Sequence, residues 1–166
     1  MALEELNKQI CPCQKCRLWQ GATYAVPGEG PEDAEIMFVG QNPGKEEDKT
    51  GRPFVGRAGK MLDKVLAENG IKREELFITN IVKHITPENR KPFADEITAC
   101  VPYLKTQISI IKPKKIVLMG VAARETPREE GIMYFEILHP SAALRFEFMR
   151  KKFREQVQEL AKKLKE

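Results

Sequence analysis

The chain has 166 residues, about the length at which one hydrophobic core is expected, so we predict a single domain over residues 1–166. Its 42% hydrophobic and 31% charged residues, with no apolar run near the ~20 residues that cross a bilayer, are typical of a globular protein and exclude a membrane-spanning one. The first ten residues lack the basic and then apolar layout of a secretory signal, which predicts a cytoplasmic, intracellular protein. We expect a monomer.

Four apolar runs rich in β-formers predict buried strands. They cover residues 35–40, 76–80, 115–120 and 134–138, and each ends at a Gly, Asn or His-Pro junction. Because these strands alternate with helical patterns, we predict an α/β fold, a three-layer α/β/α sandwich around a four-stranded, mainly parallel sheet.

Three helices are predicted between and after these strands. Residues 58–69 place their apolar side chains on one helical face and close with Gly70. Residues 97–111 and 146–164 also show apolar spacings of three and four. Pro102 should start a fresh turn or kink the helix that contains it, because proline lacks the backbone N–H.

Polar residues suited to chemistry follow three of the four predicted strands. In a parallel sheet, ligands bind beyond the carboxyl ends of the strands. These ends are residues 40–44 (GQNPG), 79–80 (TN) and 139–141 (HPS). We therefore expect the functional site at this edge of the sheet.

The net charge is +4, from 28 Lys and Arg against 24 Asp and Glu, which permits a polyanionic partner without requiring one. Basic residues gather near the C-terminus, where a phosphate-binding patch is one interpretation and a solvated helix face is the other. They are Arg145, Arg150, Lys151, Lys152 and Arg154.

The four cysteines are Cys11, Cys13, Cys16 and Cys100. The Cys-x-x-Cys spacing of Cys13 and Cys16 lets two thiolates reach one metal or cluster, whereas disulfides are disfavoured inside cells. A redox dithiol or unpaired thiols are the weaker alternatives, and spacing alone does not separate zinc from iron-sulfur. Cys100 precedes Pro102, a favoured first helical residue, so its thiolate is expected near a helix N-terminus.

Seven motifs, in a fixed order, resemble those of family 4 uracil-DNA glycosylases, the iron-sulfur members of the uracil-DNA glycosylase superfamily. The resemblance covers about residues 10–160, and the motifs lie at residues 26–31, 38–48, 51–59, 78–83, 89–92, 100–104 and 139–145. It implies a monofunctional DNA-repair enzyme that flips uracil out of DNA and hydrolyses its N-glycosidic bond to leave an abasic site. It also implies an iron-sulfur cluster of the 4Fe-4S type, with zinc as the alternative.

The resemblance assigns a base pocket to three residues. A base inside a duplex is out of reach, so the enzyme needs a stacking surface and an amide that reads the base edge. Phe54 matches the stacking aromatic, Asn80 matches the edge-reading amide, and Gly40 belongs to the same pocket. Without the motifs, Phe54 would be interpreted as a core residue and Asn80 as a turn former.

The last motif supplies the expected leaving-group and DNA contacts. His139 matches the residue that donates to uracil O2 as negative charge develops there, for which a neutral imidazole suffices. Residues 141–145 resemble the segment that enters the DNA minor groove, with Ser141 in the loop and Leu144 or Arg145 as the wedge. An ordinary strand-to-helix turn is the alternative for Ser141.

The chain departs from the family pattern after its first strand, where Gln41 and Asn42 replace a motif that begins with Glu. Gln41 cannot take a proton as a carboxylate does, so a general base at this position is in question. Asn42 resembles the Asn of mismatch-specific uracil and thymine glycosylases, which orients the attacking water. An amide can suffice because the bond breaks with oxocarbenium character.

A second departure concerns the cluster. Cys13, Cys16 and Cys100 match family ligands, but the position of the remaining cysteine is His84. A His ligand is chemically reasonable, since imidazole replaces thiolate in Rieske centres. We expect His84 as the fourth ligand, with Cys11 as its rival.

The altered pair at positions 41 and 42 leaves two further hypotheses open. One is a glycosylase for another deaminated base, such as hypoxanthine or xanthine. The other is a DNA-binding module that kept the fold without catalysis.

Overall fold

The strands form one sheet in the order β2-β1-β3-β4, and every neighbouring pair is parallel. The computed structural model describes residues 1–166. The strand bounds are Ile36–Gly40 for β1, Phe77–Asn80 for β2, Lys115–Met119 for β3 and Met133–Ile137 for β4. All four predicted strands are therefore confirmed, each within one residue of its predicted bounds.

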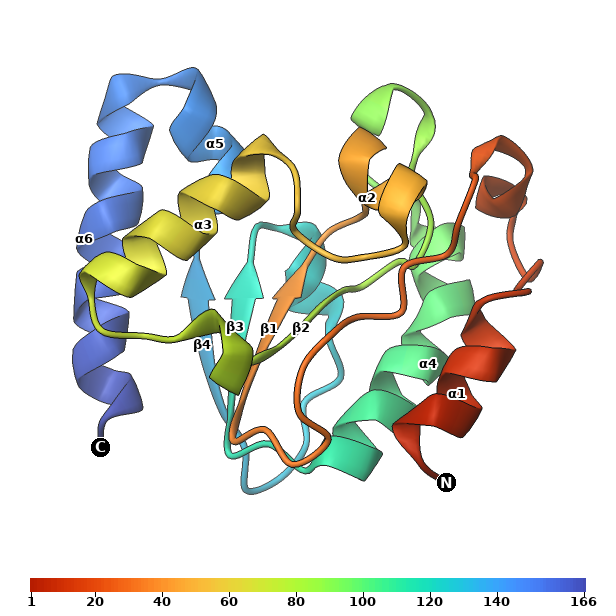
Figure 1. The fold of residues 1–166 in the computed structure, drawn as a ribbon, viewed down its shortest axis with the longest axis horizontal. Helices are drawn as coiled ribbons and strands as arrows, with labels where there is room; N and C mark the ends of the chain where they lie inside the picture. Colours follow the sequence, from red (N-terminus) through yellow and green to blue (C-terminus); the bar gives the residue numbers. More distant parts are fainter.

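Helices cover both faces of the sheet (Figure 1). One face carries α3 (Arg57–Glu68), α5 (Pro140–Arg145) and α6 (Glu147–Leu164), and the other carries α1 (Leu3–Ile10) and α4 (Ala94–Ile111). The short helices are α2 (Lys45–Thr50), η1 (Arg17–Gly21), η2 (Arg73–Glu75), η3 (Pro87–Asn89) and η4 (Ala122–Glu125). This arrangement confirms the predicted three-layer α/β/α sandwich.

Two separate apolar cores follow from the alternation of side chains along the strands. In β1, Met37 and Val39 face the core beneath α1 and α4, whereas Phe38 faces the core beneath α3 and α6. The central strands β1 and β3 are covered on both faces, which explains why they appear in the sequence as continuous apolar runs.

The expectation that Pro102 starts a fresh helical turn is wrong, because the helix continues through it. Residues Ala94–Ile111 form one α-helix with Pro102 inside it, and Cys100 therefore lies in the helix interior, not near its N-terminus. The helix begins at Ala94 because Glu96 accepts a hydrogen bond from the backbone N–H of Phe93, as in a capping box. The buried apolar face of α4 offsets the single backbone hydrogen bond that Pro102 removes.

No helix combines the length and apolar character needed to cross a membrane.

Candidate active site

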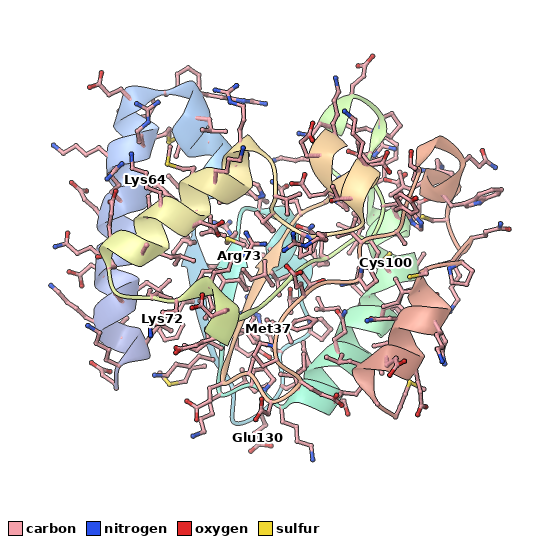
Figure 2. All side chains as sticks on the ribbon, viewed as in Figure 1. Met37, Lys64, Lys72, Arg73, Cys100 and Glu130 are labelled. Carbon is pink, nitrogen blue, oxygen red and sulfur yellow. The ribbon has the colours of Figure 1, made fainter.

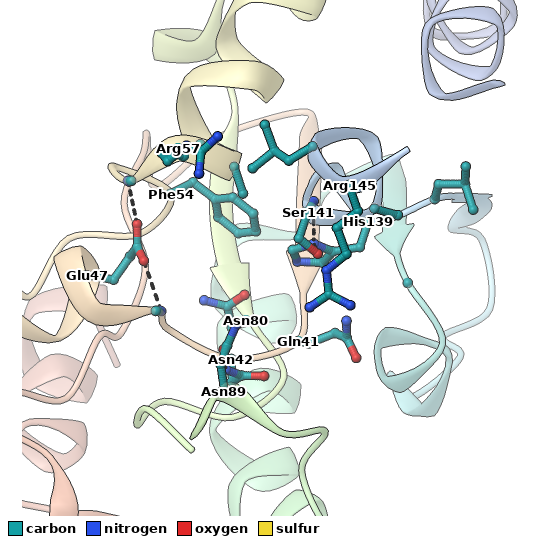
Figure 3. A pocket seen from close by; sticks show the side chains of 18 of the residues that line it. Gln41, Asn42, Glu47, Phe54, Arg57, Asn80, Asn89, His139, Ser141 and Arg145 are labelled. Atoms are coloured by element: carbon teal, nitrogen blue, oxygen red, sulfur yellow. Dashed lines mark hydrogen bonds between the residues drawn. The ribbon is translucent and has the colours of Figure 1, made fainter. Parts of the chain in front are cut away.

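A cavity of about 690 Å³ opens at the carboxyl ends of the strands, between the β1–α3 segment and α5. It contains almost all of the residues expected at the site, because parallel strands end at one edge of the sheet. Figure 3 shows Asn80, Asn42 and Asn89 on one side and His139, Ser141 and Arg145 on the other. The expected residues that line it are Gln41, Asn42, Phe54, Asn80, His139, Ser141, Leu144 and Arg145.

Gly40 does not line the cavity but makes its floor possible. A Cβ at Gly40 would lie 2.5 Å from Cζ of Phe54 and 2.6 Å from Oδ1 of Asn80, both far inside van der Waals contact. Only glycine therefore lets the aromatic ring and the amide approach the end of β1 together. The structure thus brings the three expected pocket residues into one cluster.

Phe54 has a left-handed backbone, with φ of 49°, which is unfavourable for an aromatic residue. Two contacts hold it there. Arg73 donates to the Phe54 carbonyl at 2.6 Å, and Gly59 leaves room for that carbonyl, since a Cβ at Gly59 would lie 1.9 Å from it. The backbone strain is thus held by tertiary contacts, which fix the ring over the cavity with its centroid 5.8 Å from that of His139.

Glu47 organises the loops around the cavity, a role that our sequence analysis did not assign. Its buried carboxylate accepts hydrogen bonds from the backbone N–H groups of Gly44 at 2.9 Å, Val55 at 2.8 Å and Gly56 at 2.6 Å. It thereby ties the start of α2 to the loop that carries Phe54 (Figure 3). A Glu three residues after a helix-starting Gly is a capping signal that could have identified it.

Two buried side-chain oxygens have no hydrogen-bond partner within the protein, and both belong to the cavity. They are Oδ1 of Asn80 and Oε1 of Gln41. Asn80 is 1% exposed. Buried acceptors without donors are unfavourable, so these two oxygens are suited to a ligand that presents N–H groups.

His139 is held as a neutral imidazole with a defined tautomer. Burial lowers its pKa to about 4, so the ring is uncharged at neutral pH. Its Nδ1 accepts a hydrogen bond from the backbone N–H of Ser141 at 3.1 Å and lies 2.8 Å from the Ser141 hydroxyl. Because Nδ1 is an acceptor, the proton lies on Nε2, which is left to donate to a ligand.

Asn42 and Asn89 form an amide pair at the edge of the cavity. The Nδ2 group of Asn42 donates to Oδ1 of Asn89 at 2.8 Å and to the Pro43 carbonyl at 3.1 Å. Asn89 has a left-handed backbone, with φ of 56°, at the end of η3. The sequence analysis noted Asn89 only as part of a motif, since nothing in the spacing indicated that it meets Asn42.

The basic cluster near the C-terminus is divided by the fold. Arg145 is exposed and lines the cavity, whereas Arg150 donates to the Ala143 carbonyl and Arg154 pairs with Glu68. Lys151 and Lys152 are exposed on α6. Of the five basic residues, only Arg154 has its charge paired with a carboxylate, and only Arg145 lines this cavity.

A family model of the uracil DNA glycosylase superfamily matches residues 27–165. The chain belongs to this superfamily. It is 57% identical over 120 residues to a type-4 uracil-DNA glycosylase of Sulfurisphaera tokodaii, an alignment that covers 72% of this chain and 54% of the relative. For the type-4 enzyme of Saccharolobus solfataricus the identity is 50% over 119 residues, with 71% and 55% covered.

The type-4 uracil-DNA glycosylase of Thermotoga maritima is 48% identical over 121 residues, covering 73% of this chain and 63% of the relative. The chain thus spans about half to two thirds of the length of these relatives. The resemblance to family 4 is confirmed, and it includes the segments that form the cavity.

This superfamily member also brings three of its cysteines together. Cys13 and Cys16, in the loop before η1, pack with buried Cys100 of α4 against one core, and Figure 2 shows Cys100 on the side of the sheet away from α3. The backbone N–H groups of Leu18 and Lys83 lower the pKa of Cys16 and Cys100, respectively, and so favour the thiolate forms that a cluster binds.

The thiols of Cys16 and Cys100 are protonated at neutral pH without a cation. Burial raises the pKa of Cys100 to about 11 and raises that of Cys16, and the neighbouring cysteines raise both further. A bound cation would reverse this, because its charge favours thiolates. No three His, Cys, Asp or Glu side chains are arranged to hold a single metal ion.

His84 and Cys11, the two candidate fourth ligands, differ in their surroundings. His84 is 5% exposed, burial lowers its pKa, and it follows Lys83, whose backbone N–H lowers the pKa of Cys100. Cys11 is exposed at the end of α1.

Proposed function

We propose that this chain is a DNA-repair glycosylase that flips uracil out of DNA, hydrolyses its N-glycosidic bond and leaves an abasic site. The observation that carries the proposal is that two buried amide oxygens, Oδ1 of Asn80 and Oε1 of Gln41, have no partner in a cavity that Phe54 and a neutral His139 also line. An extruded uracil is complementary to this cavity. Its flat face can stack on Phe54, its ring N–H can donate to an unpaired amide oxygen, and its carbonyl oxygen, on which charge develops, can accept from His139.

Phe54 and Asn80 recognise the flipped base. The flipped base stacks on the Phe54 ring, and its N3–H donates to Oδ1 of Asn80, whose side chain makes no hydrogen bond within the protein. Cytosine has no hydrogen at N3, so it would leave this buried oxygen unpaired and face it with a lone pair. A binding site discriminates strongly against an analogue that leaves one of its buried polar groups without a hydrogen-bond partner.

Bond cleavage needs stabilisation of the uracil anion as it leaves. The Nε2–H of His139 donates to uracil O2, while the Ser141 N–H at Nδ1 keeps the ring in that tautomer. The imidazole keeps its proton, because its depressed pKa makes it an uncharged hydrogen-bond donor. The deoxyribose becomes oxocarbenium-like as the electrons of the C1′–N1 bond move to the base; a water then forms the new C1′–O bond, and the proton that it releases neutralises the departing uracil anion.

The attacking water is oriented by amides, with no general base. The Asn42–Asn89 pair, joined at 2.8 Å, holds the Asn42 side chain at the cavity edge so that its Oδ1 can accept from the water. Gln41 contributes an uncharged amide where the family has a carboxylate. An oxocarbenium-like sugar reacts with water that is positioned but not deprotonated, so this substitution is compatible with turnover.

DNA is held from the α5 side of the cavity. Leu144 and Arg145 line the opening, with Leu144 half-buried and Arg145 exposed. Inserting one of them into the minor groove would fill the gap left by the extruded nucleotide, and the arginine also adds a positive charge near the phosphates.

The cysteine site fits an iron-sulfur cluster. Cys13, Cys16 and Cys100 pack against the same core, and the thiols of Cys16 and Cys100 have raised pKa values that a bound cation would lower. The burial of His84, against the exposure of Cys11, supports His84 as the fourth ligand. When bound, the cluster cross-links the N-terminal loop to α4. The absence of a tight three-ligand group disfavours a single zinc ion.

A second candidate substrate class rests on Gln41. Its buried Oε1 is a second unpaired acceptor, whereas uracil in DNA has only one ring N–H. Xanthine and hypoxanthine carry ring N–H groups too, and xanthine carries two on its six-membered ring. A deaminated purine is thus the alternative base for this pocket.

The decisive experiment uses end-labelled DNA with one uracil, hypoxanthine or xanthine, followed by alkaline cleavage of abasic sites. We expect cleavage at uracil, with single- and double-stranded substrates, and none at cytosine. Cleavage at the purines alone would select the second candidate. DNA binding without cleavage of any substrate would leave a non-catalytic module.

A further inference from the structure

Lys83 is a buried lysine that the site described above does not use. Its side chain is 0% exposed, and its Nζ donates to Oγ1 of Thr79 at 2.6 Å, the carbonyl of Asn80 at 2.8 Å and Oε1 of Gln107 at 2.9 Å. Three acceptors thus match the three N–H bonds of an ammonium group. None of them is a carboxylate.

Burying an ammonium group whose three hydrogen-bond partners are all neutral is unfavourable. A hydrocarbon side chain of the same size would avoid that cost, as replacements of buried charges show. Packing alone therefore does not explain a lysine here. Its acceptors provide a better explanation, because two of them belong to the last two residues of β2, next to the cavity.

The lysine belongs to a network that anchors the end of β2 from three directions. Thr79 Oγ1 donates to the Pro27 carbonyl at 2.7 Å, and Gln107 Nε2 donates to the same carbonyl at 2.7 Å. The backbone of Lys83 is also held, since its carbonyl accepts from Val26 N–H at 2.7 Å. The ammonium therefore joins α4 to the end of β2 at a single atom, and Thr79 and Gln107 connect both to the segment before β1.

Asn80 depends on this anchor because its own side chain has none. Its amide makes no hydrogen bond within the protein, and its Oδ1 is unpaired. The direction of that amide is set by contact with Gly40 and by the backbone position of Asn80. By donating to the Asn80 carbonyl, Lys83 holds the Asn80 backbone, and the position of this backbone sets the direction of Oδ1.

We propose that Lys83 is a positioning residue that holds the edge-reading amide of Asn80 in place for the flipped base. This inference rests on the proposed function, since it assigns Lys83 to the base-reading step. Lys83 touches neither the substrate nor the cavity and acts only through Asn80. Losing it allows the amide to move, and small misplacements at a reacting centre reduce rates by up to about 100-fold.

The first test is Lys83→Met, which keeps the length of the side chain and removes the charge. We expect kcat/KM on uracil-containing DNA to fall by about 10–100-fold. The control is Lys115→Met, because Lys115 also donates to three carbonyls, those of Lys163, Leu164 and Glu166, at the opposite end of the sheet. This control should lower Tm by a few degrees and leave kcat/KM unchanged.

A double-mutant cycle distinguishes positioning from a general structural role. In an Asn80→Ala background, Lys83→Met should have little further effect on kcat/KM, because the amide that it positions is gone. Equal losses in both backgrounds, or a Lys83→Met enzyme with wild-type kcat/KM, would overturn the proposal. If Lys83→Met does not fold, Gln107→Leu, which removes one acceptor, is expected to show a smaller loss with the same dependence on Asn80.

A measurement without activity separates this inference from the proposed function. The side-chain amide of Asn80 gives an NMR signal whose order parameter should fall in Lys83→Met and stay unchanged in Lys115→Met. An inactive wild-type protein would refute the glycosylase proposal, and the NMR comparison would still test Lys83. An unchanged Asn80 order parameter in Lys83→Met would refute the positioning role.

Discussion

The base pocket takes its polar side chains from the ends of neighbouring parallel strands, whereas the cysteine site joins a loop before the sheet to the middle of α4. In the pocket, Asn80 and His139 are set by the strands and by backbone contacts. In the cysteine site, Cys16 and Cys100 are 84 positions apart, and the pKa of each thiol is raised. The pocket is thus organised by strand ends and backbone contacts, whereas the cysteine site joins distant segments through thiols that burial keeps protonated.

Two links connect these regions. One link is Glu96, whose side chain is fully buried. Its carboxylate accepts hydrogen bonds from Arg17, which follows Cys16, and from Arg90, which follows Asn89. The hydrogen bonds from Arg90 lower the pKa of the Glu96 carboxyl to about 2. Lys83 provides the other link. The comparison therefore predicts that pocket mutations affect mainly rate and that cysteine mutations affect mainly stability.

The largest expected effect lies in the pocket. Asn80→Ala and His139→Ala should each lower kcat by about 100–1,000-fold, the usual cost of removing one donor or acceptor at a site of developing charge. Single-turnover cleavage of uracil DNA measures this, and thermal melting should show a folded protein. Near wild-type rates in either variant would remove that residue from the site.

The next effect tests the cysteine site. Cys100→Ser should reduce bound iron, and the absorbance near 400 nm, from stoichiometric to near zero, and should lower Tm, because a bound group stabilises only the folded state. Cys11→Ser is the control and should keep its iron. Loss of iron in Cys11→Ser, with none lost in His84→Ala, would show that Cys11 and not His84 is the fourth ligand.

A smaller effect is expected around the pocket. Glu47→Gln keeps the shape of the side chain but leaves only one oxygen for three backbone N–H groups. Activity should fall about 10-fold and stability by about 1–3 kcal/mol, from backbone donors left unpaired. The control is Glu46→Gln, whose carboxylate is exposed and pairs only with Lys49. Equal behaviour of the two variants would show that Glu47 does not organise these loops.

The smallest effect is a pH dependence. NMR titration should give His139 a midpoint near pH 4, assigned by its loss in His139→Ala. Since its pKa is lower in the folded state than the usual 6.5, the unfolded chain binds more protons between pH 6.5 and 4. Stability should therefore decline as pH falls through this window. A midpoint above 6 would mean that the imidazole is not desolvated.

Much of the fold was predictable because the apolar pattern is strong. The runs at residues 35–40 and 115–120 are buried on both faces, so their continuous apolar character and length identified them as buried strands. The junctions after them identified the site edge. Pro102 misled the prediction, because a local rule about proline was outweighed by burial along the whole face of α4.

The roles of single atoms were not predictable. Spacing did not reveal that Asn42 meets Asn89, that Glu47 binds three backbone groups, or that Lys83 is buried with neutral partners. Such contacts join residues that are distant in the chain, and their strength depends on burial, which a sequence pattern does not report.

The sequence by itself determined the α/β class, the strand order along the chain, the edge of the sheet where the site lies and the resemblance to family 4. The tertiary structure decided which side chains meet there, the neutral state and tautomer of His139, and the oxygens left unpaired on Asn80 and Gln41. The physical reason is that secondary structure follows from local periodicity, whereas hydrogen-bond partners and pKa values follow from desolvation and long-range packing.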